Sequence, residues 1–178
     1  MPLAFGDILA KLEEQKTELL LQIERWTPEM LNYRPTPAEW SVLEMLDHIV
    51  RTEIAILSAA RSRLTNPHPI GLADKLRTAF LQKVFASDRK VKVPVSARQV
   101  LPGSALQLED IRRRWNDSRQ ELNSFLSHTN SEQLSKGLFR HPVGGWMGMQ
   151  QMLEFFSVHL IHHHYQLDRI ARATSNQT

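Results

Sequence analysis

The sequence predicts an all-α protein, a four-helix bundle with a long crossover between its second and third helices. Long stretches repeat apolar residues with the helical period of about 3.6, and no stretch alternates for long enough to require a sheet. A connection of residues 66–104 between the second and third stretches favours one crossover over simple hairpins. The four predicted helices are residues 3–26, 41–65, 104–128 and 149–174.

The length and composition favour a single domain. The chain has 178 residues, 42% of them hydrophobic, which is enough to bury one sizeable core. No internal repeat, low-complexity tract or linker divides it. We therefore expect one domain over residues 1–178, with an ordered core over about residues 3–174.

The first predicted helix has an apolar side and a clear stop signal. Thr27-Pro28 ends it, and the same pair suits the cap and first position of a short following turn, TPEMLNY. The residues available for the core are Ile8, Leu12, Leu19 and Ile23.

Capping patterns predict where the middle helices begin. Ser41-Val-Leu-Glu44 has the spacing of a capping box, and Ser104-Ala-Leu-Gln107 repeats it. Between them, residues 72–90 form an amphipathic helix and VPVSARQVLPGS forms a proline-marked connection. The third helix should bury Leu108, Ile111, Trp115, Leu122 and Phe125.

The segment before the last helix is expected to be a loop. GLFRHPVGGWMG contains four glycines, which favour irregular backbone over a helix or strand. The last helix should then begin at Met149.

Two histidines on the last helix are the main functional signal. His159 and His163 are one helical turn apart and therefore project from the same face. On a helical wheel both lie inside the apolar stripe, whereas His162 lies at its edge and His164 at its side. His48 lies at the margin of the apolar stripe of the second helix. The stripe around the pair comprises Met149, Met152, Leu153, Phe156, Leu160, Leu167 and Ile170.

A metal site is the interpretation that best explains the histidine pair. A lone buried histidine, such as His48 taken by itself, is more often a core residue with a satisfied hydrogen bond than a ligand. Two buried imidazoles each need a polar partner, and one divalent ion supplies both. Three histidines leave a fourth position open, as in catalytic sites. Imidazole donors suit zinc or nickel first and iron next.

Other polar side chains near the histidines have simpler alternatives. Glu44 is one turn before His48, but its capping role accounts for it. Asp47 and Glu53 could accept a hydrogen bond from a ligating imidazole, although solvated helix carboxylates are commoner. Gln166 is the best candidate for that acceptor, because it lies just beyond His163 on nearly the same face.

Three residues near the predicted helix starts each have two interpretations. His141, in the glycine-rich loop, could line the entrance of the site, although a surface histidine is the commoner case. Trp40 and Trp146 flank helix starts and are expected to be packing anchors rather than ligand-stacking residues.

The composition excludes several classes of protein. The chain has no cysteine, so a disulfide framework, a thiolate zinc site and a cysteine nucleophile are excluded. A net charge of +3 with interleaved acidic residues gives no reason to expect nucleic-acid binding. Neither a signal-type segment nor an apolar run long enough for a membrane span is present, so we expect a cytoplasmic protein.

Two segments resemble the signature regions of the DinB-like (DinB/YfiT) superfamily of four-helix-bundle metalloproteins. PAEWSVLEMLDHIVRTE carries a tryptophan-serine helix start with a histidine seven residues after the serine. HPVGGWMGMQQMLEFFSVHLIHHHYQL carries the H-x-x-H-H-x-x-Q pattern of the late helix. The chain departs from the common pattern at His164 and Tyr165, where relatives often have arginine and glycine.

The resemblance implies a bundle with a crossover, a homodimer, and a divalent metal held by His48, His159 and His163. Relatives include transferases that use bacillithiol, mycothiol or glutathione. The first hypothesis is therefore a metal-dependent transferase that activates an exogenous low-molecular-weight thiol and acts on a small molecule. The alternatives are a hydrolase that uses a metal-bound hydroxide and a non-catalytic, dimeric metal-binding module.

Overall fold

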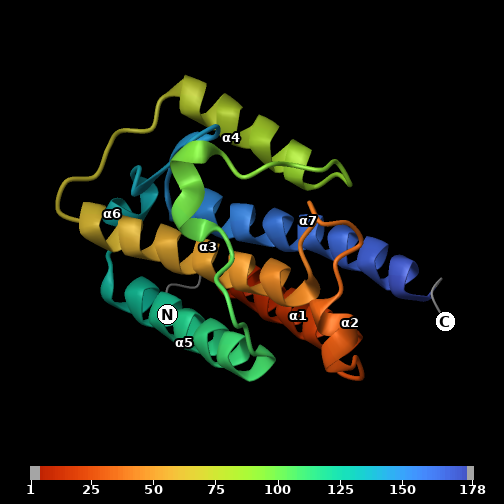
Figure 1. Cartoon of the computed structure of the whole chain (residues 1–178). Helices are drawn as coiled ribbons and strands as arrows, with labels where there is room; N and C mark the ends of the chain where they lie inside the picture. Colours follow the sequence, from red (N-terminus) through yellow and green to blue (C-terminus); the bar gives the residue numbers. More distant parts are fainter. Residues whose placement is uncertain (1–4, 176–178) are drawn as a thin grey trace.

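Four long helices form the bundle of the computed structural model, which describes residues 5–175 (Figure 1). Helix α1 packs against α7, and α3 packs against both α5 and α7. The predicted all-α four-helix bundle is confirmed, and the predicted start of the first helix at Leu3 lies outside the described residues. The four helices are α1 (Gly6–Gln22), α3 (Val42–Arg63), α5 (Leu108–His128) and α7 (Met149–Ser175).

The long connection between α3 and α5 crosses one side of the bundle. It contains helix α4 (Leu72–Phe85), which lies along α7, and a 3-10 helix, η2 (Val95–Val100), which returns to α3 (Figure 1). Helix α4 ends five residues before the predicted end at Lys90. Both the amide and the hydroxyl of Ser87 bind the carbonyl of Val84, which closes the helix there.

The first helix is shorter than predicted, but its core face is as expected. Beyond Gln22 the chain continues as turns with i→i−3 hydrogen bonds, so Thr27-Pro28 starts a new element rather than ending α1. Thr27 caps the short helix α2 (Pro28–Asn32) by accepting a hydrogen bond from the amide of Met30. The predicted core residues Leu12, Leu19 and Ile23 are fully buried, and Ile8 packs partly buried against them.

One of the two predicted capping boxes forms and the other does not. Ser41 Oγ accepts from the amide of Glu44, and the Glu44 carboxylate accepts from the amide of Ser41. At the second position α5 begins at Leu108 instead of Ser104, and its N-cap Gln107 makes no side-chain cap. Ala105 has a φ of 52°, in the left-handed region, so the chain is still turning at that point.

The glycine-rich segment forms a small hairpin rather than an irregular loop. Strands β1 (Phe139–His141) and β2 (Gly145–Met147) pair antiparallel, after the short helix α6 (Ser131–Ser135). Gly145 has a φ of +76°, and a Cβ there would lie 2.5 Å from Oδ1 of Asp74. Three-residue strands are too short to show alternation in the sequence, which is why the hairpin was missed.

A buried ion pair links α3 to α5. Oε1 of Glu53 accepts from Arg119 Nη2 at 2.7 Å, and its Oε2 accepts from Trp115 Nε1 at 3.0 Å. Glu53 is 2% exposed and both its oxygens bond α5 side chains instead of an imidazole, so both sequence-based interpretations of it were wrong. Its role is to neutralise a guanidinium inside the bundle.

Among the described residues, none of the helices has the combination of length and apolar character that a membrane crossing requires.

Replacing Glu53 should destabilise the fold strongly. Glu53→Ala leaves the buried Arg119 with only the longer contact to Glu13 at 3.7 Å, and losing one partner of a buried pair costs about 3–5 kcal/mol. Urea denaturation of the apoprotein measures the free energy of unfolding. Glu121→Ala is the matched control, because it breaks the exposed Arg61–Glu121 pair between the same two helices and should cost less than about 1 kcal/mol. Equal losses in the two variants would contradict the assignment.

Candidate metal centre

The structure brings His48, His159 and His163 together in the interior. The Nε2 atom of His159 lies 3.3 Å from Nε2 of His48 and 3.0 Å from Nε2 of His163. All three side chains are buried, and one ring nitrogen from each lies within 4.8 Å of the others. Tetrahedral zinc with Zn–N bonds of about 2.0–2.1 Å separates two ligand nitrogens by about 3.3–3.4 Å, which is close to the observed spacing.

His48 faces the interior although the helical wheel placed it at the margin of the stripe. Residues 45–50 of α3 are all buried, because the crossover connection covers the side of the helix that a simple bundle would leave exposed. The Nδ1 atom of His48 lies 2.8 Å from the carbonyl oxygen of Val100 in η2. A backbone carbonyl gives no signal in a sequence pattern, so this partner could not be predicted.

Hydrogen bonds made by Nδ1 determine the tautomers of His48 and His163 and leave Nε2 unprotonated in both. A carbonyl oxygen only accepts, so Nδ1 of His48 donates to Val100 and its Nε2 carries a lone pair. Nδ1 of His163 likewise donates to Oε1 of Gln166 at 3.0 Å, as the position of Gln166 in the sequence suggested. The lone pairs on Nε2 of His48 and on Nε2 of His163 therefore both face Nε2 of His159. A single proton on that nitrogen can form a good hydrogen bond with only one of the two. A divalent cation satisfies all three nitrogens, so the donor set fits a metal ion.

The three imidazoles are neutral and available as ligands at neutral pH. Burial lowers the pKa of His48 to about 4. Burial, and then the neighbouring imidazoles, hold the pKa of His159 and of His163 well below the ordinary value. A ligand that is already unprotonated need not lose a proton when a metal binds.

The three histidines lie in the wall of a cavity of about 550 Å³. Helices α3, α4 and α7, the 3-10 helix η2 and the β-hairpin all contribute to this wall. A ligand inside the cavity can therefore reach the trio. Much of the lining is apolar, including Trp40, Ile56, Phe85, Val93, Phe139 and Phe155.

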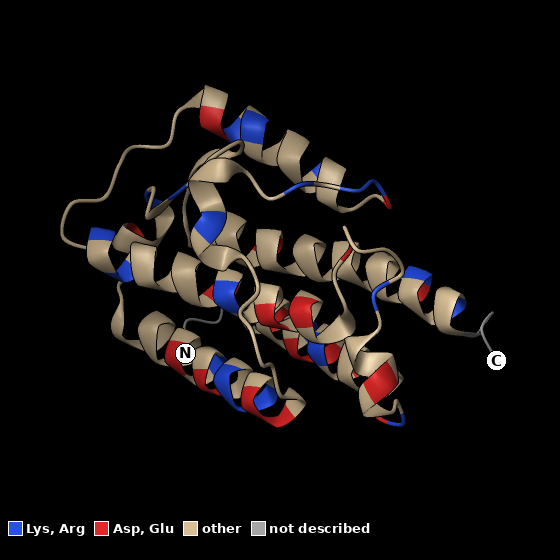
Figure 2. Cartoon of the chain, viewed as in Figure 1, with Lys and Arg blue, Asp and Glu red and all other residues tan. Residues whose placement is uncertain are grey.

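The charged groups around the cavity are mostly cationic. Four cationic side chains line it, and Lys90 among them pairs with Glu39, the one carboxylate in the lining. The segment between α4 and η2 supplies part of this charge (Figure 2). The other three are Lys92, Arg140 and Arg169.

Of the remaining histidines near the site, His162 and His141 differ from the sequence-based expectation and His164 agrees with it. His162 was placed at the edge of the stripe, but it is buried, with its ring 5.3 Å from that of Phe85 on α4. His141 lines the cavity, which agrees with the alternative prediction and not with the favoured one of a surface histidine. His164 is half-buried and outside the lining.

The two tryptophans also differ from each other. Trp40 lines the cavity, and its ring lies 4.7 Å from that of His48, so it borders the site as well as packing. Trp146 stacks on His68 at 4.4 Å and lies under the guanidinium of Arg63, as expected of a packing anchor.

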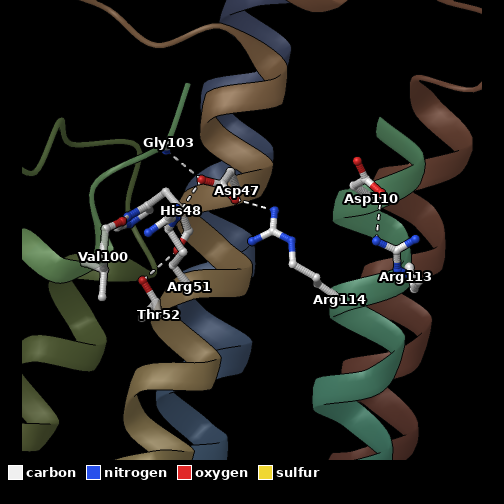
Figure 3. Close-up of polar contacts among 9 residues, drawn as sticks. All are labelled: Asp47, His48, Arg51, Thr52, Val100, Gly103, Asp110, Arg113 and Arg114. Carbon is white, nitrogen blue, oxygen red and sulfur yellow. Dashed lines mark hydrogen bonds and ion pairs between the residues drawn. The ribbon is translucent and has the colours of Figure 1, made fainter. Parts of the chain in front are cut away.

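Asp47 holds the connection that supports His48 (Figure 3). Its carboxylate accepts from the amide of Gly103 at 2.8 Å and from Arg51 and Arg114. Burial raises the pKa of Asp47, but the Gly103 amide and the two guanidinium groups outweigh burial and keep the pKa below its ordinary value. The hydrogen-bond partners of Asp47 are thus one amide and two guanidinium groups, and the side chain is fully buried, so both the favoured solvated carboxylate and the alternative of an imidazole acceptor were wrong. It fixes the backbone that carries the acceptor of His48.

Loss of a predicted ligand should abolish tight metal binding. His159→Ala and His163→Ala each leave two of three nitrogens, so affinity for Zn²⁺ should fall by more than the roughly 10–100-fold typical of lost supporting hydrogen bonds. Competition with a chromophoric chelator measures this affinity. His164→Ala, on the same helix but outside the cavity lining, is the control and should bind like the unmodified chain. Unchanged binding after loss of His159 and of His163 would exclude the site.

Asp47→Asn tests the supporting role of that carboxylate. The variant weakens the attachment of Gly103, so the Val100 carbonyl should hold His48 less firmly and Zn²⁺ affinity should fall by about 10-fold or more. Asp110→Asn is the control, because Asp110 bonds Arg113 on the exposed side of α5 (Figure 3). The same chelator titration applies. If Asp47→Asn and Asp110→Asn both retained full affinity, Asp47 would have no part in the site.

Comparison with known proteins agrees with the fold. Residues 11–167 match the model of the DinB superfamily. The chain is 24% identical over 161 residues to YuaE of Bacillus subtilis strain 168, an uncharacterized protein, covering 88% of this chain and 93% of YuaE. Its fold is similar to that of YfiT from Bacillus subtilis, with a TM-score of 0.64 and 17% identity over 96% of this chain and 87% of YfiT. YfiT is described as a probable metal-dependent hydrolase with an unusual four-helix bundle topology. The match to most of the chain shows that this protein belongs to the DinB superfamily.

Proposed function

We propose that the protein is a metal-dependent hydrolase of small acyl compounds such as esters or amides. One observation carries the proposal: three neutral imidazoles direct Nε2 toward a single point in the wall of a cavity large enough for a small molecule. The similar fold of YfiT, described as a probable metal-dependent hydrolase, supports the same reaction class. Zinc or nickel suits the donor set first, and iron next.

Different residues would hold the ion, orient its ligands and exclude solvent in such a site. His48, His159 and His163 would hold the ion, while Val100 and Gln166 fix the orientation of two of the rings. When bound, a divalent ion would supply a Lewis acid that polarises a carbonyl group and acidifies water. The apolar walls would exclude bulk solvent, and the cationic side chains favour a substrate that carries negative charge.

Transfer to an exogenous thiol is the second candidate, and the cationic cavity favours it. The chain has no cysteine, so the thiol would have to enter the cavity from outside. The excess of cationic side chains in the lining would stabilise a thiolate relative to a thiol. Bacillithiol, mycothiol and glutathione are candidate cosubstrates. The same assay separates this reaction from hydrolysis.

An ester panel with and without thiol tests the proposal. Protein purified without an affinity tag is depleted with a chelator and reloaded with Zn²⁺, Ni²⁺ or Fe²⁺, and release of p-nitrophenol from p-nitrophenyl esters is followed. We expect turnover that needs the ion, does not need thiol and is lost in His159→Ala but kept in His164→Ala. Turnover only with added glutathione would overturn hydrolysis in favour of transfer. If the protein bound one metal ion per chain but showed no turnover with or without thiol, both enzymatic proposals would fail and the non-catalytic metal-binding module would be favoured.

The homodimer implied by the family resemblance is a separate prediction. Size-exclusion chromatography with light scattering should give twice the chain mass of 20.6 kDa. A mass of one chain at micromolar concentration would contradict it.

A further inference from the structure

His141 has a fixed protonation pattern because of the turn that follows it. Its Nδ1 accepts from the backbone amides of Val143 at 3.1 Å and Gly144 at 3.0 Å. An atom that accepts two N–H bonds carries a lone pair, so the proton of the neutral ring must be on Nε2. Burial lowers the pKa of His141 to about 4, which keeps the ring neutral at physiological pH.

The protonated nitrogen of His141 is left without an acceptor. Within residues 5–175, Nε2 of this ring makes no hydrogen bond with the protein, it is not among the fully buried polar atoms, and the side chain lines the cavity. An accessible N–H in a cavity wall that bonds no protein atom is open to whatever occupies the cavity. A molecule in the cavity can supply the missing acceptor.

An aromatic ring lies between the imidazoles of His141 and His159. The ring of Phe155 lies 5.1 Å from that of His141 and is stacked on the ring of His159 at 5.4 Å. The donor and the proposed metal ligand therefore flank the same phenyl ring in the wall of the same cavity. A small molecule in contact with the trio is within the region that His141 borders.

The hairpin that carries His141 is anchored at several points. Thr78 on α4 donates to the carbonyl of Gly144, and Asp74 accepts from the amide of Trp146. A Cβ at Gly144 would lie 2.5 Å from Cε of Met147, so the turn packs closely on its surroundings. A donor held by such a turn needs little reorganisation when a ligand binds.

We propose that Nε2–H of His141 donates a hydrogen bond to the acyl oxygen of the substrate. During attack on an ester or amide carbonyl, negative charge develops on that oxygen, and a preorganised donor stabilises it. The neutral ring donates the hydrogen bond without giving up its proton, so His141 itself needs no reprotonation, and the proton that the attacking water loses goes to the leaving group by another route. This inference rests on the proposed hydrolase and assigns one of its catalytic residues.

Two substitutions of His141 distinguish the donor role of Nε2 from the structural role of Nδ1, which accepts hydrogen bonds from the turn. In His141→Asn, the side-chain oxygen can replace Nδ1 as acceptor for the turn amides, but the Nε2–H donor is lost. In His141→Gln, the longer amide can reach toward the cavity and restore a donor. His68→Ala is the control, because His68 stacks on Trp146 of the same hairpin but does not line the cavity.

Kinetics of the zinc-loaded protein test the role in catalysis. We expect His141→Asn to lower kcat/KM for p-nitrophenyl esters by about 10²–10³-fold, as for loss of one oxyanion donor, with unchanged zinc content. His141→Gln should recover part of that loss, and His68→Ala should be close to the unmodified chain. Full activity in His141→Asn, or a loss that simply follows zinc content, would overturn the proposal.

Two further measurements do not depend on turnover. Long-range ¹H–¹⁵N correlation spectra of the apoprotein at pH 7 should show His141 protonated on Nε2 and not on Nδ1. Benzoate, whose carboxylate offers an acceptor oxygen, should bind the zinc-loaded protein at least 10-fold more weakly in His141→Asn. A proton on Nδ1, or equal benzoate affinity, would overturn the donor assignment. If no ester is hydrolysed, the proposed hydrolase fails while these two results still decide the donor.

Discussion

The hydrogen bond from His48 to the carbonyl of Val100 is the contact on which the proposed site depends. It joins a bundle helix to the crossover connection, orients the ring and leaves Nε2 free. Without the connection, the side of α3 that carries His48 would be exposed, and its imidazole would be hydrated and mobile. The crossover therefore does more than link two helices, because it encloses the third histidine and supplies the acceptor that selects its tautomer.

Two buried carboxylates elsewhere in the bundle are compensated by hydrogen-bond donors. Asp47 is fully buried, but one amide and two guanidinium groups compensate its charge. Glu53 is compensated by Arg119 and Trp115. The trio of histidines is different, because the lone pairs of His48 and His163 converge on Nε2 of His159, which carries at most one proton.

The sequence predicted what periodicity and local chemistry determine, and missed what the tertiary contacts determine. The four helices, the Ser41 capping box and the grouping of His159 with His163 follow from spacing along one helix. The start of α5 was misplaced because the amide of Gly103 binds Asp47 on another helix, a contact that a local capping pattern cannot include. The burial of Asp47, Glu53 and His162 likewise depends on which element covers them. For His48, the helical wheel left the answer open and only the family resemblance favoured it.

The charge of the donor set limits which substrates such a site would prefer. Three neutral imidazoles leave the charge of a divalent ion uncompensated, whereas a site with carboxylate ligands would cancel part of it. The cavity adds four cationic side chains and one carboxylate, so its lining reinforces the positive potential instead of offsetting it. Apolar walls lower the local dielectric constant and make that potential act more strongly on a bound group. The same potential would favour the anionic form of an acidic molecule in the cavity, whose apolar wall includes Trp40, Phe85 and Phe139.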